Sequence, residues 1–200
     1  IFTDMINRYG VKDVVVEYVC MLDDIAKLPI ATTYAIILAF QYIEDRLPEN
    51  LEENDKDAEN IIFSTQLVLN SCATQSLVNT LANLEIEKGK LIQGFIDYTD
   101  KMDPVNRGLV LGNVREFREI HNSYEDISPP ETTLEQEDAE PRETQMYETE
   151  DVYHFISYLP KNGFLWELDS LKKHPVKLMA IKEGKNWLER LQSILSERIE

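Results

Sequence analysis

A cysteine stands at the start of a predicted helix and limits the folds open to this chain. Cys72 follows Asn70 and Ser71, two residues that favour the N-terminal cap of a helix. Beyond it, apolar residues recur at the spacing of one helix face: Ala73, Leu77, Leu81 and Leu84. A thiol at a helix N-terminus lies at the positive end of the helix dipole, which favours the nucleophilic thiolate. A lone cysteine is more often a small buried apolar residue, so the assignment needs support from elsewhere in the chain.

Three further residues supply that support. Gln66 lies six positions before Cys72, and its side-chain amide can donate to an oxyanion together with the backbone N–H of Cys72. His154 and Asp169 lie on two predicted strands that are joined by a turn signal, Asn162-Gly163. Such a hairpin can place the two side chains side by side, so that the carboxylate accepts from one ring nitrogen and the other faces the sulfur. Taken alone, Gln66 would be interpreted as a solvated polar residue.

These motifs resemble a known family, the ubiquitin C-terminal hydrolases, which are cysteine deubiquitinases with a papain-like fold. The resemblance rests on Gln66, on the run Asn70-Ser-Cys72-Ala-Thr, on His154-Phe-Ile-Ser-Tyr and on Glu167-Leu-Asp169. It covers nearly the whole chain. The run Cys-Ala-Thr-Gln and the long segment before the histidine are most similar to the long-form members, which are associated with the proteasome or with chromatin.

The sequence departs from the family pattern at three places. Ser170 stands where the family usually has glycine after the aspartate. The tryptophan-containing lead-in before Phe2-Thr3 is absent, and so is the apolar strand that usually follows the helix ending near Ile199. We therefore interpret residues 1–200 as a single catalytic domain trimmed at both ends.

The resemblance implies hydrolysis at the C-terminal glycine of ubiquitin through an acyl-enzyme thioester. It assigns Cys72 as nucleophile, His154 as base and acid, Asp169 as the group that orients the histidine, and Gln66 as oxyanion donor. No cofactor is implied. The implied partners are ubiquitin and its conjugates, with proteasome or chromatin complexes reached through regions outside this chain, in the cytoplasm or nucleus. The alternative is a ubiquitin-binding scaffold with the same fold and little turnover, which Ser170 and the missing terminal strand suggest.

Most of the negative charge is concentrated in two segments. The formal net charge is −17, residues 44–59 hold eight acidic and two basic residues, and residues 123–151 hold eleven acidic residues and one basic residue. The remaining body is close to neutral, which disfavours a nucleic-acid partner because phosphate binding needs a basic surface. The acidic segments suit a basic protein partner, such as the arginine-rich tail that the resemblance implies. Solvated, disordered loops that keep a protein in solution explain this composition better, with attraction of a basic partner as a by-product.

The cysteines, histidines and apolar runs argue against a disulfide-bonded, metal-binding or membrane-spanning protein. The two cysteines, Cys20 and Cys72, lack Cys-x-x-Cys spacing, which indicates a reducing compartment and no thiolate zinc site. Cys20 lies in an apolar run and is predicted to be buried, without a disulfide to Cys72. His121 and His174 have no suitably spaced partner, so we expect no metal site. No uncharged apolar run approaches the ~20 residues of a membrane span.

Periodicity and turn signals predict the elements. Helices are expected at residues 2–9, 71–85, 91–102, 103–123 and 187–199, and strands at 14–21, 34–43, 153–159 and 164–169. A helix is the alternative at 34–43. Gly108 and Gly112 weaken the prediction for 103–123. Residues 123–151 have no apolar stripe and contain three prolines, so we expect a disordered acidic loop that, by the resemblance, crosses over the cleft. The predicted fold class is α+β, with a helical lobe packed on a mainly antiparallel sheet.

Overall fold

A computed structural model describes residues 1–41, 56–68, 70–124, 153–182 and 184–199. Its elements in chain order are α1 (Phe2–Arg8), η1 (Leu22–Lys27), β1 (Ile36–Gln41), η3 (Lys56–Asn60), α2 (Cys72–Asn83), α3 (Gly89–Thr99), α4 (Pro104–Asn113), α5 (Arg115–Asn122), β2 (Tyr153–Lys161), β3 (Phe164–Asp169), β4 (Val176–Ala180) and α6 (Trp187–Ile199). Most of the acidic run at 44–59 and of the expected crossover loop at 123–151 lies outside the described residues. In the described part of the chain, no helix is long and apolar enough to span a membrane.

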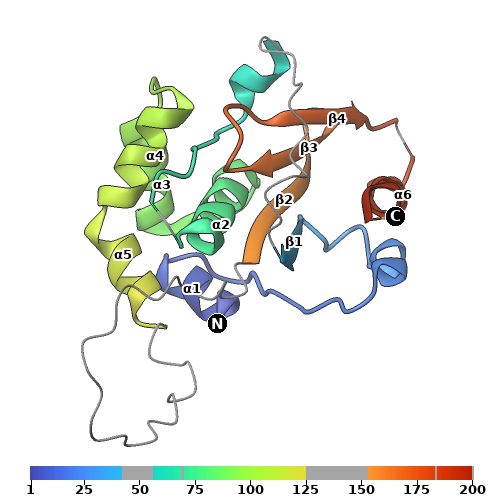
Figure 1. Ribbon diagram of the computed structural model, residues 1–200, viewed down its shortest axis with the longest axis horizontal. Coiled ribbons are helices and arrows are strands. Elements are labelled where there is room, and N and C mark those ends of the chain that lie inside the picture. The colour runs from blue at the N-terminus through green and yellow to red at the C-terminus, as the bar shows by residue number, and fades with distance from the viewer. Residues whose placement is uncertain (42–55, 69, 125–152, 183, 200) are drawn as a thin grey trace, which may run out of the picture.

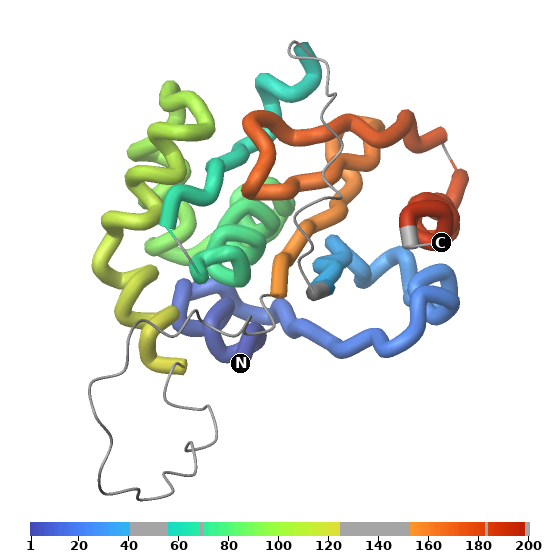
Figure 2. Tube along the Cα trace, in the orientation of Figure 1, coloured from blue at the N-terminus to red at the C-terminus, as the bar shows by residue number. Residues whose placement is uncertain are grey.

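The described residues form two lobes that meet along α2. Helices α1 to α5 gather on one side, and an antiparallel sheet in the order β1-β2-β3-β4 forms the other (Figure 1). Helix α2 packs against β2, whereas α6 and η1 lie together at the far side of the sheet (Figure 2). The arrangement of helices and sheet agrees with the predicted α+β class.

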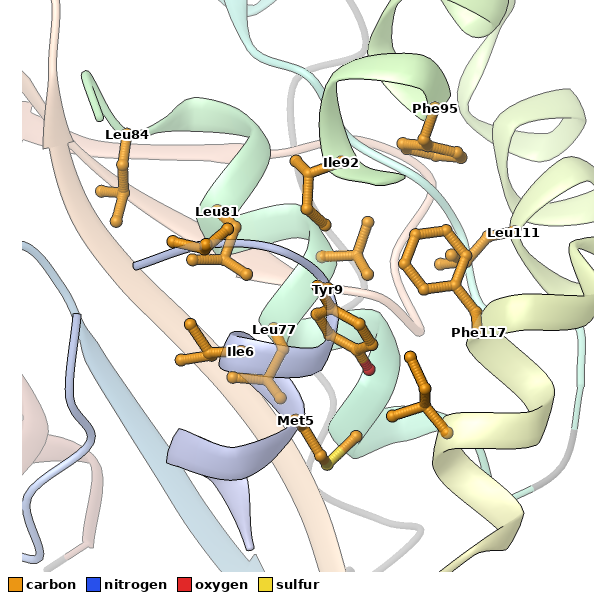
Figure 3. Close-up of a cluster of buried hydrophobic side chains, with 13 residues drawn as sticks. Met5, Ile6, Tyr9, Leu77, Leu81, Leu84, Ile92, Phe95, Leu111 and Phe117 are labelled. Carbon is orange, nitrogen blue, oxygen red and sulfur yellow. The ribbon is translucent and has the colours of Figure 1, made fainter. Parts of the chain in front are cut away.

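The helical lobe has its own apolar core. Leu77 and Leu81, from the predicted stripe of α2, are buried there with Tyr9, which follows α1, and Phe117 of α5 (Figure 3). The rings of Tyr9 and Phe117 meet edge to face with centroids 5.2 Å apart, a favourable aromatic geometry. The apolar stripe that follows Cys72 therefore buries α2 in the lobe and leaves its first residue at the lobe boundary.

Both faces of the sheet are covered, and each contributes to an apolar cluster. Along β2, Ile156 and Tyr158 point to the cluster shared with α6, whereas Leu159 points to a second cluster with Trp166. Ser157 lies on the α2 side and binds hydroxyl groups of that helix. This alternation follows from the two-residue period of a strand.

The predicted strand at 14–21 is wrong. The segment forms no strand, and Tyr18 is 90% exposed. The Val16 backbone N–H donates to the hydroxyl of Thr3 at 2.9 Å instead of to a neighbouring strand. Cys20, predicted to be buried, is exposed because this segment runs over the surface. β-branched residues favour a strand only where a partner strand accepts them, and none of the described strands pairs with this segment.

One predicted helix is divided in the structure, and one strand was not predicted. The single helix expected over 103–123 is divided at Val114, whose backbone is extended, into α4 and α5. The break allows Phe117 of α5 to enter the same core as Leu111 of α4. Strand β4 was not predicted, because its sequence Val-Lys-Leu-Met-Ala does not alternate and its pairing includes a register shift opposite Leu165 and Trp166.

The glycines that weaken the predicted helix have a packing role. A Cβ at Gly108 would overlap the carbonyl oxygen of Thr65, and a Cβ at Gly112 would lie 2.7 Å from Cγ2 of Val68. Helix α4 therefore approaches the segment before Cys72 more closely than side chains would permit. The two glycines therefore allow residues 65–68 to pack directly against the backbone of α4.

We predict that Gly108→Ala lowers the free energy of unfolding by about 1–3 kcal/mol, because an overlapping methyl group must displace the Thr65 backbone. Gly94→Ala in α3 is the matched control: its Cβ would meet nothing within 4 Å, so the better helix propensity should stabilise by about 0.5–1 kcal/mol. Urea unfolding of both variants measures the difference. A stabilised Gly108→Ala variant would contradict the close approach.

Candidate active site

The backbone before Cys72 brings the sulfur to the boundary between the lobes. Asn70 adopts φ +60°, a turn conformation that asparagine tolerates, and Ser71 is the N-cap of α2. The sequence predicted that a side chain here would cap the helix. The Ser71 hydroxyl instead donates to the carbonyl of Val68 at 2.7 Å. In the described structure no side chain caps this end, so the first-turn N–H groups and the helix dipole act on the region around Cys72.

His154 and Asp169 are brought together by the register of the hairpin. Asp169 pairs with Ile156 across β2 and β3, so His154 lies two residues further along on the same face. This diagonal relation suits long side chains. Nε2 of His154 lies 2.7 Å from Oδ1 of Asp169, with the two residues 3% and 0% exposed. Asn162 and Gly163 have φ of 51° and 80°, as the predicted two-residue turn requires.

One oxygen of Asp169 makes both of its described hydrogen bonds. Besides His154, Oδ1 accepts the backbone N–H of Leu171 at 3.0 Å. Oδ2 is buried and has no hydrogen-bond partner among the described residues. The turn after β3 therefore holds the carboxylate in place, and the carboxylate in turn fixes the imidazole ring.

The sulfur of Cys72 lies at the start of β2. In the thiol form, Sγ donates to the carbonyl of Tyr153 at 3.3 Å, one residue before His154. Burial lowers the pKa of His154, but hydrogen bonds to Asp169 and Cys72 outweigh it and raise that pKa to about 9. The ring of Phe40 meets the imidazole edge to face at 5.7 Å, which adds an apolar wall. The site is therefore built to keep the imidazole protonated beside the sulfur at neutral pH.

Gln66 lies between the turn after β3 and the loop before Cys72. Its backbone N–H donates to the carbonyl of Ser170 at 2.8 Å, and its side-chain Nε2 donates to the carbonyl of Val68 at 3.1 Å. The Ser170 hydroxyl donates to its Oε1 at 3.2 Å. The structure thus places Gln66 in the loop that leads to Cys72, and its oxyanion role stays a prediction.

A ladder of amide side chains on α2 holds the segment that carries Gln66. Asn79 accepts the Ser64 N–H at 2.9 Å through Oδ1 and donates to the Ser64 carbonyl at 3.1 Å. Asn83 accepts the Ile62 N–H at 2.9 Å and donates to the Ile62 carbonyl, as a neighbouring strand would. Gln75 donates to the Ser64 carbonyl at 2.8 Å. This ladder was not predicted, although polar amides recur in the sequence at positions 75, 79 and 83, at intervals of about one helical turn.

His121 has a described partner that the sequence did not suggest. Its Nδ1 lies 2.9 Å from the hydroxyl of Thr74 in the first turn of α2. The contact joins α5 to the helix that carries Cys72. Among the described residues, no group of His, Cys, Asp or Glu side chains converges on a position that could hold a metal ion.

Comparison with known proteins connects this geometry to a family. A family model described as "Ubiquitin carboxyl-terminal hydrolase, family 1" matches residues 1–200. The chain belongs to this family. Ubiquitin carboxyl-terminal hydrolase ubh-4 of Caenorhabditis elegans is 30% identical over 203 residues, covering all of this chain and 59% of that protein. Isozyme L5 of Dictyostelium discoideum is 31% identical over 201 residues, covering all of this chain and 54% of that protein.

The chain thus spans less than two thirds of the length of these two family members. The catalytic domain of Trichinella spiralis UCH37, solved bound to ubiquitin vinyl methyl ester, is 27% identical with a TM-score of 0.79. The match covers 99% of this chain and 83% of that one. It confirms the predicted papain-like α+β fold, and the relatives confirm the resemblance to the long-form branch of the ubiquitin C-terminal hydrolases.

We predict that His154 loses its ring proton near pH 9, and that Asp169→Asn lowers this pKa by about one to three units because the charged partner is removed. The stabilisation linked to the protonated ring is therefore complete below the ordinary pKa of about 6.5 and is lost as pH rises through about 9.

Histidine ring resonances followed by NMR against pH provide the measurement. The chain has three histidines, so His121→Gln and His174→Gln variants assign the remaining signal. If His154 titrates near 6.5 in both the parent and the Asp169→Asn variant, the coupling of these groups is wrong.

Proposed function

We propose that this chain is a cysteine deubiquitinase that hydrolyses the bond at the C-terminal glycine of ubiquitin. The observation that carries the proposal is the assembled arrangement of Cys72, His154 and Asp169 in a ubiquitin C-terminal hydrolase fold. The names of the relatives, and the ubiquitin vinyl methyl ester bound to the similar UCH37 domain, support the substrate class. The same arrangement favours turnover over a binding scaffold, because a scaffold has no need of a buried ion pair at a cysteine.

The reaction follows from the positions of these groups. The Cys72 thiolate attacks the carbonyl carbon of the terminal glycine, and the charge passes to the carbonyl oxygen. His154, protonated at neutral pH, donates its proton to the leaving group as the thioester forms. Water then attacks the thioester with His154 as general base, and Cys72 leaves as thiolate. Asp169 holds the ring in position throughout and stabilises its charged form.

The Cys72 backbone N–H and the Gln66 carboxamide are the proposed donors to the oxyanion. A carboxamide carries two N–H donors, and the Val68 carbonyl uses one of them. The second supplies the bond to the developing negative charge. Because that charge exists only in the transition state, this donor acts on the rate of chemistry more than on binding.

The proposal extends to the partners and the compartment of this chain. Residues 1–200 act as a single catalytic domain, and proteasome or chromatin complexes are reached through regions outside this chain. Both described cysteines are free, which is typical of the reducing cytoplasm or nucleus. The acidic charge of the chain, formally −17, suits the basic tail of ubiquitin.

Cys72→Ala should abolish hydrolysis of a ubiquitin ester or amide while ubiquitin binding is kept or strengthened, because only the reacting sulfur is removed. Hydrolysis rates and isothermal titration with ubiquitin measure the two effects. Ubiquitin vinyl methyl ester should label the parent and a Cys20→Ser control, but not Cys72→Ala. Hydrolysis by Cys72→Ala at the parent rate would refute the nucleophile assignment.

Gln66→Ala should lower kcat by about 10²–10³-fold with a much smaller change in KM, as expected when one oxyanion donor is lost. Steady-state kinetics on a ubiquitin amide separate the two constants. A raised KM with unchanged kcat would assign Gln66 to binding instead.

A further inference from the structure

Ser170 connects the two halves of the candidate active site. It follows Asp169 at the end of β3 and is 1% exposed. Its carbonyl accepts the backbone N–H of Gln66 at 2.8 Å, and its hydroxyl donates to Gln66 Oε1 at 3.2 Å. One residue of the sheet lobe therefore binds both the backbone and the side chain of the predicted oxyanion donor.

The hydroxyl of Ser170 determines which end of the carboxamide faces the cysteine loop. With Oε1 bound to Ser170, Nε2 is turned toward the Val68 carbonyl in the loop that leads to Cys72. The Ser71 hydroxyl, next to Cys72, donates to the same carbonyl at 2.7 Å. The final torsion of a glutamine side chain is broad, so without the donor at Oε1 only the Nε2 bond to the Val68 carbonyl resists rotation of the amide. A rotated amide would present an oxygen instead of N–H groups.

We propose that Ser170 is a positioning residue that fixes the Gln66 carboxamide with its N–H groups toward the reaction at Cys72. This inference rests on the proposed hydrolysis of ubiquitin conjugates. A residue without a side-chain hydroxyl at this position could not supply this bond.

The hydroxyl is not needed to hold the turn itself. The backbone bond from Gln66 N–H to the Ser170 carbonyl joins the two segments independently of the side chain. The turn is further closed by Leu171 N–H to Asp169 Oδ1 at 3.0 Å and by Lys172 N–H to the Asp169 carbonyl at 2.9 Å. Removing the hydroxyl should therefore leave the turn in place and free only the carboxamide.

A double-mutant cycle on kcat tests the proposal. Ser170→Ala should lower kcat about 3–10-fold, the effect of one lost neutral hydrogen bond, and change KM less than twofold. Ser170→Gly should lower kcat at least as much. In the Gln66→Ala background, Ser170→Ala should have no further effect on kcat, because the group that it positions is gone. The same fold-loss in both backgrounds, or an unchanged kcat in Ser170→Ala, overturns the proposal.

Thr99→Val is the matched control for losing a buried hydroxyl. Thr99 is 0% exposed and donates to the Phe95 carbonyl at 2.8 Å, within α3 and away from the site. This variant should lower the urea midpoint and leave kcat at the parent value. If it lowers kcat as much as Ser170→Ala does, the effect is one of general stability and the proposal fails.

The side-chain amide resonances of Gln66 give a readout that does not depend on turnover. They are assigned by their loss in Gln66→Ala, and they should shift and broaden in Ser170→Ala but not in Thr99→Val. Unchanged resonances would overturn the proposal even if kcat falls. A parent protein that neither hydrolyses a ubiquitin amide nor reacts with ubiquitin vinyl methyl ester would overturn the proposed function and this inference together. Turnover by the parent with no effect of Ser170→Ala would overturn this inference alone.

Discussion

Helix α2 meets strand β2 and the segment before Gln66 through buried polar side chains, and the site depends on that contact. Ser76 and Thr80 share the hydroxyl of Ser157 in β2, at 2.6 and 2.8 Å. On an adjacent face, Asn79 binds the extended segment before Gln66. Such a network is stable only when its members are satisfied together, because an unpaired polar group in the interior is costly. The polar contacts therefore allow few alternative positions for α2, and an apolar interface would tolerate sliding more readily.

A second buried network supports the sheet lobe behind the site. Glu167 is 0% exposed in β3 and forms ion pairs with Lys172 of the following turn and Arg198 of α6. Burial also raises the pKa of the neighbouring Tyr158 hydroxyl, which keeps it neutral. Breaking one half of a buried pair leaves an uncompensated charge, so these partners join α6 and the turn to the strand that ends at Asp169.

Local patterns predicted the parts of this fold that local chemistry determines. The bounds of β3 and α6 were predicted correctly, since Asn162-Gly163 defines the turn and the spacing from Trp187 to Ile199 defines the helix. The failures depend on distant partners. Residues 14–21 have strand propensity but no described strand beside them, and β4 forms only because β3 offers an edge. The break at Val114 serves a core that the sequence does not display.

In the candidate active site, too, local features were predicted and contacts between distant residues were not. Cys72, His154 and Asp169 were placed from a helix start and a hairpin, and the structure brings His154 into contact with the other two. The hydrogen bond between Gln66 and Ser170 joins residues 104 positions apart, so no local sequence pattern predicts it. It is visible only once the turn after β3 has been placed against the cysteine loop.

The diagonal placement of His154 and Asp169 has an evolutionary consequence. A slip of one residue between β2 and β3 would move Asp169 to the opposite face of the sheet from His154, because side chains alternate. That register is set at the far end of the hairpin, about 20 Å along the strands from the acid–base pair. Asn162 and Gly163 form a surface turn that contacts none of the reacting groups. Their backbone conformation nevertheless determines whether His154 and Asp169 can meet. Selection on activity would therefore limit sequence change at these two positions, although they lie on the surface and away from the reacting groups.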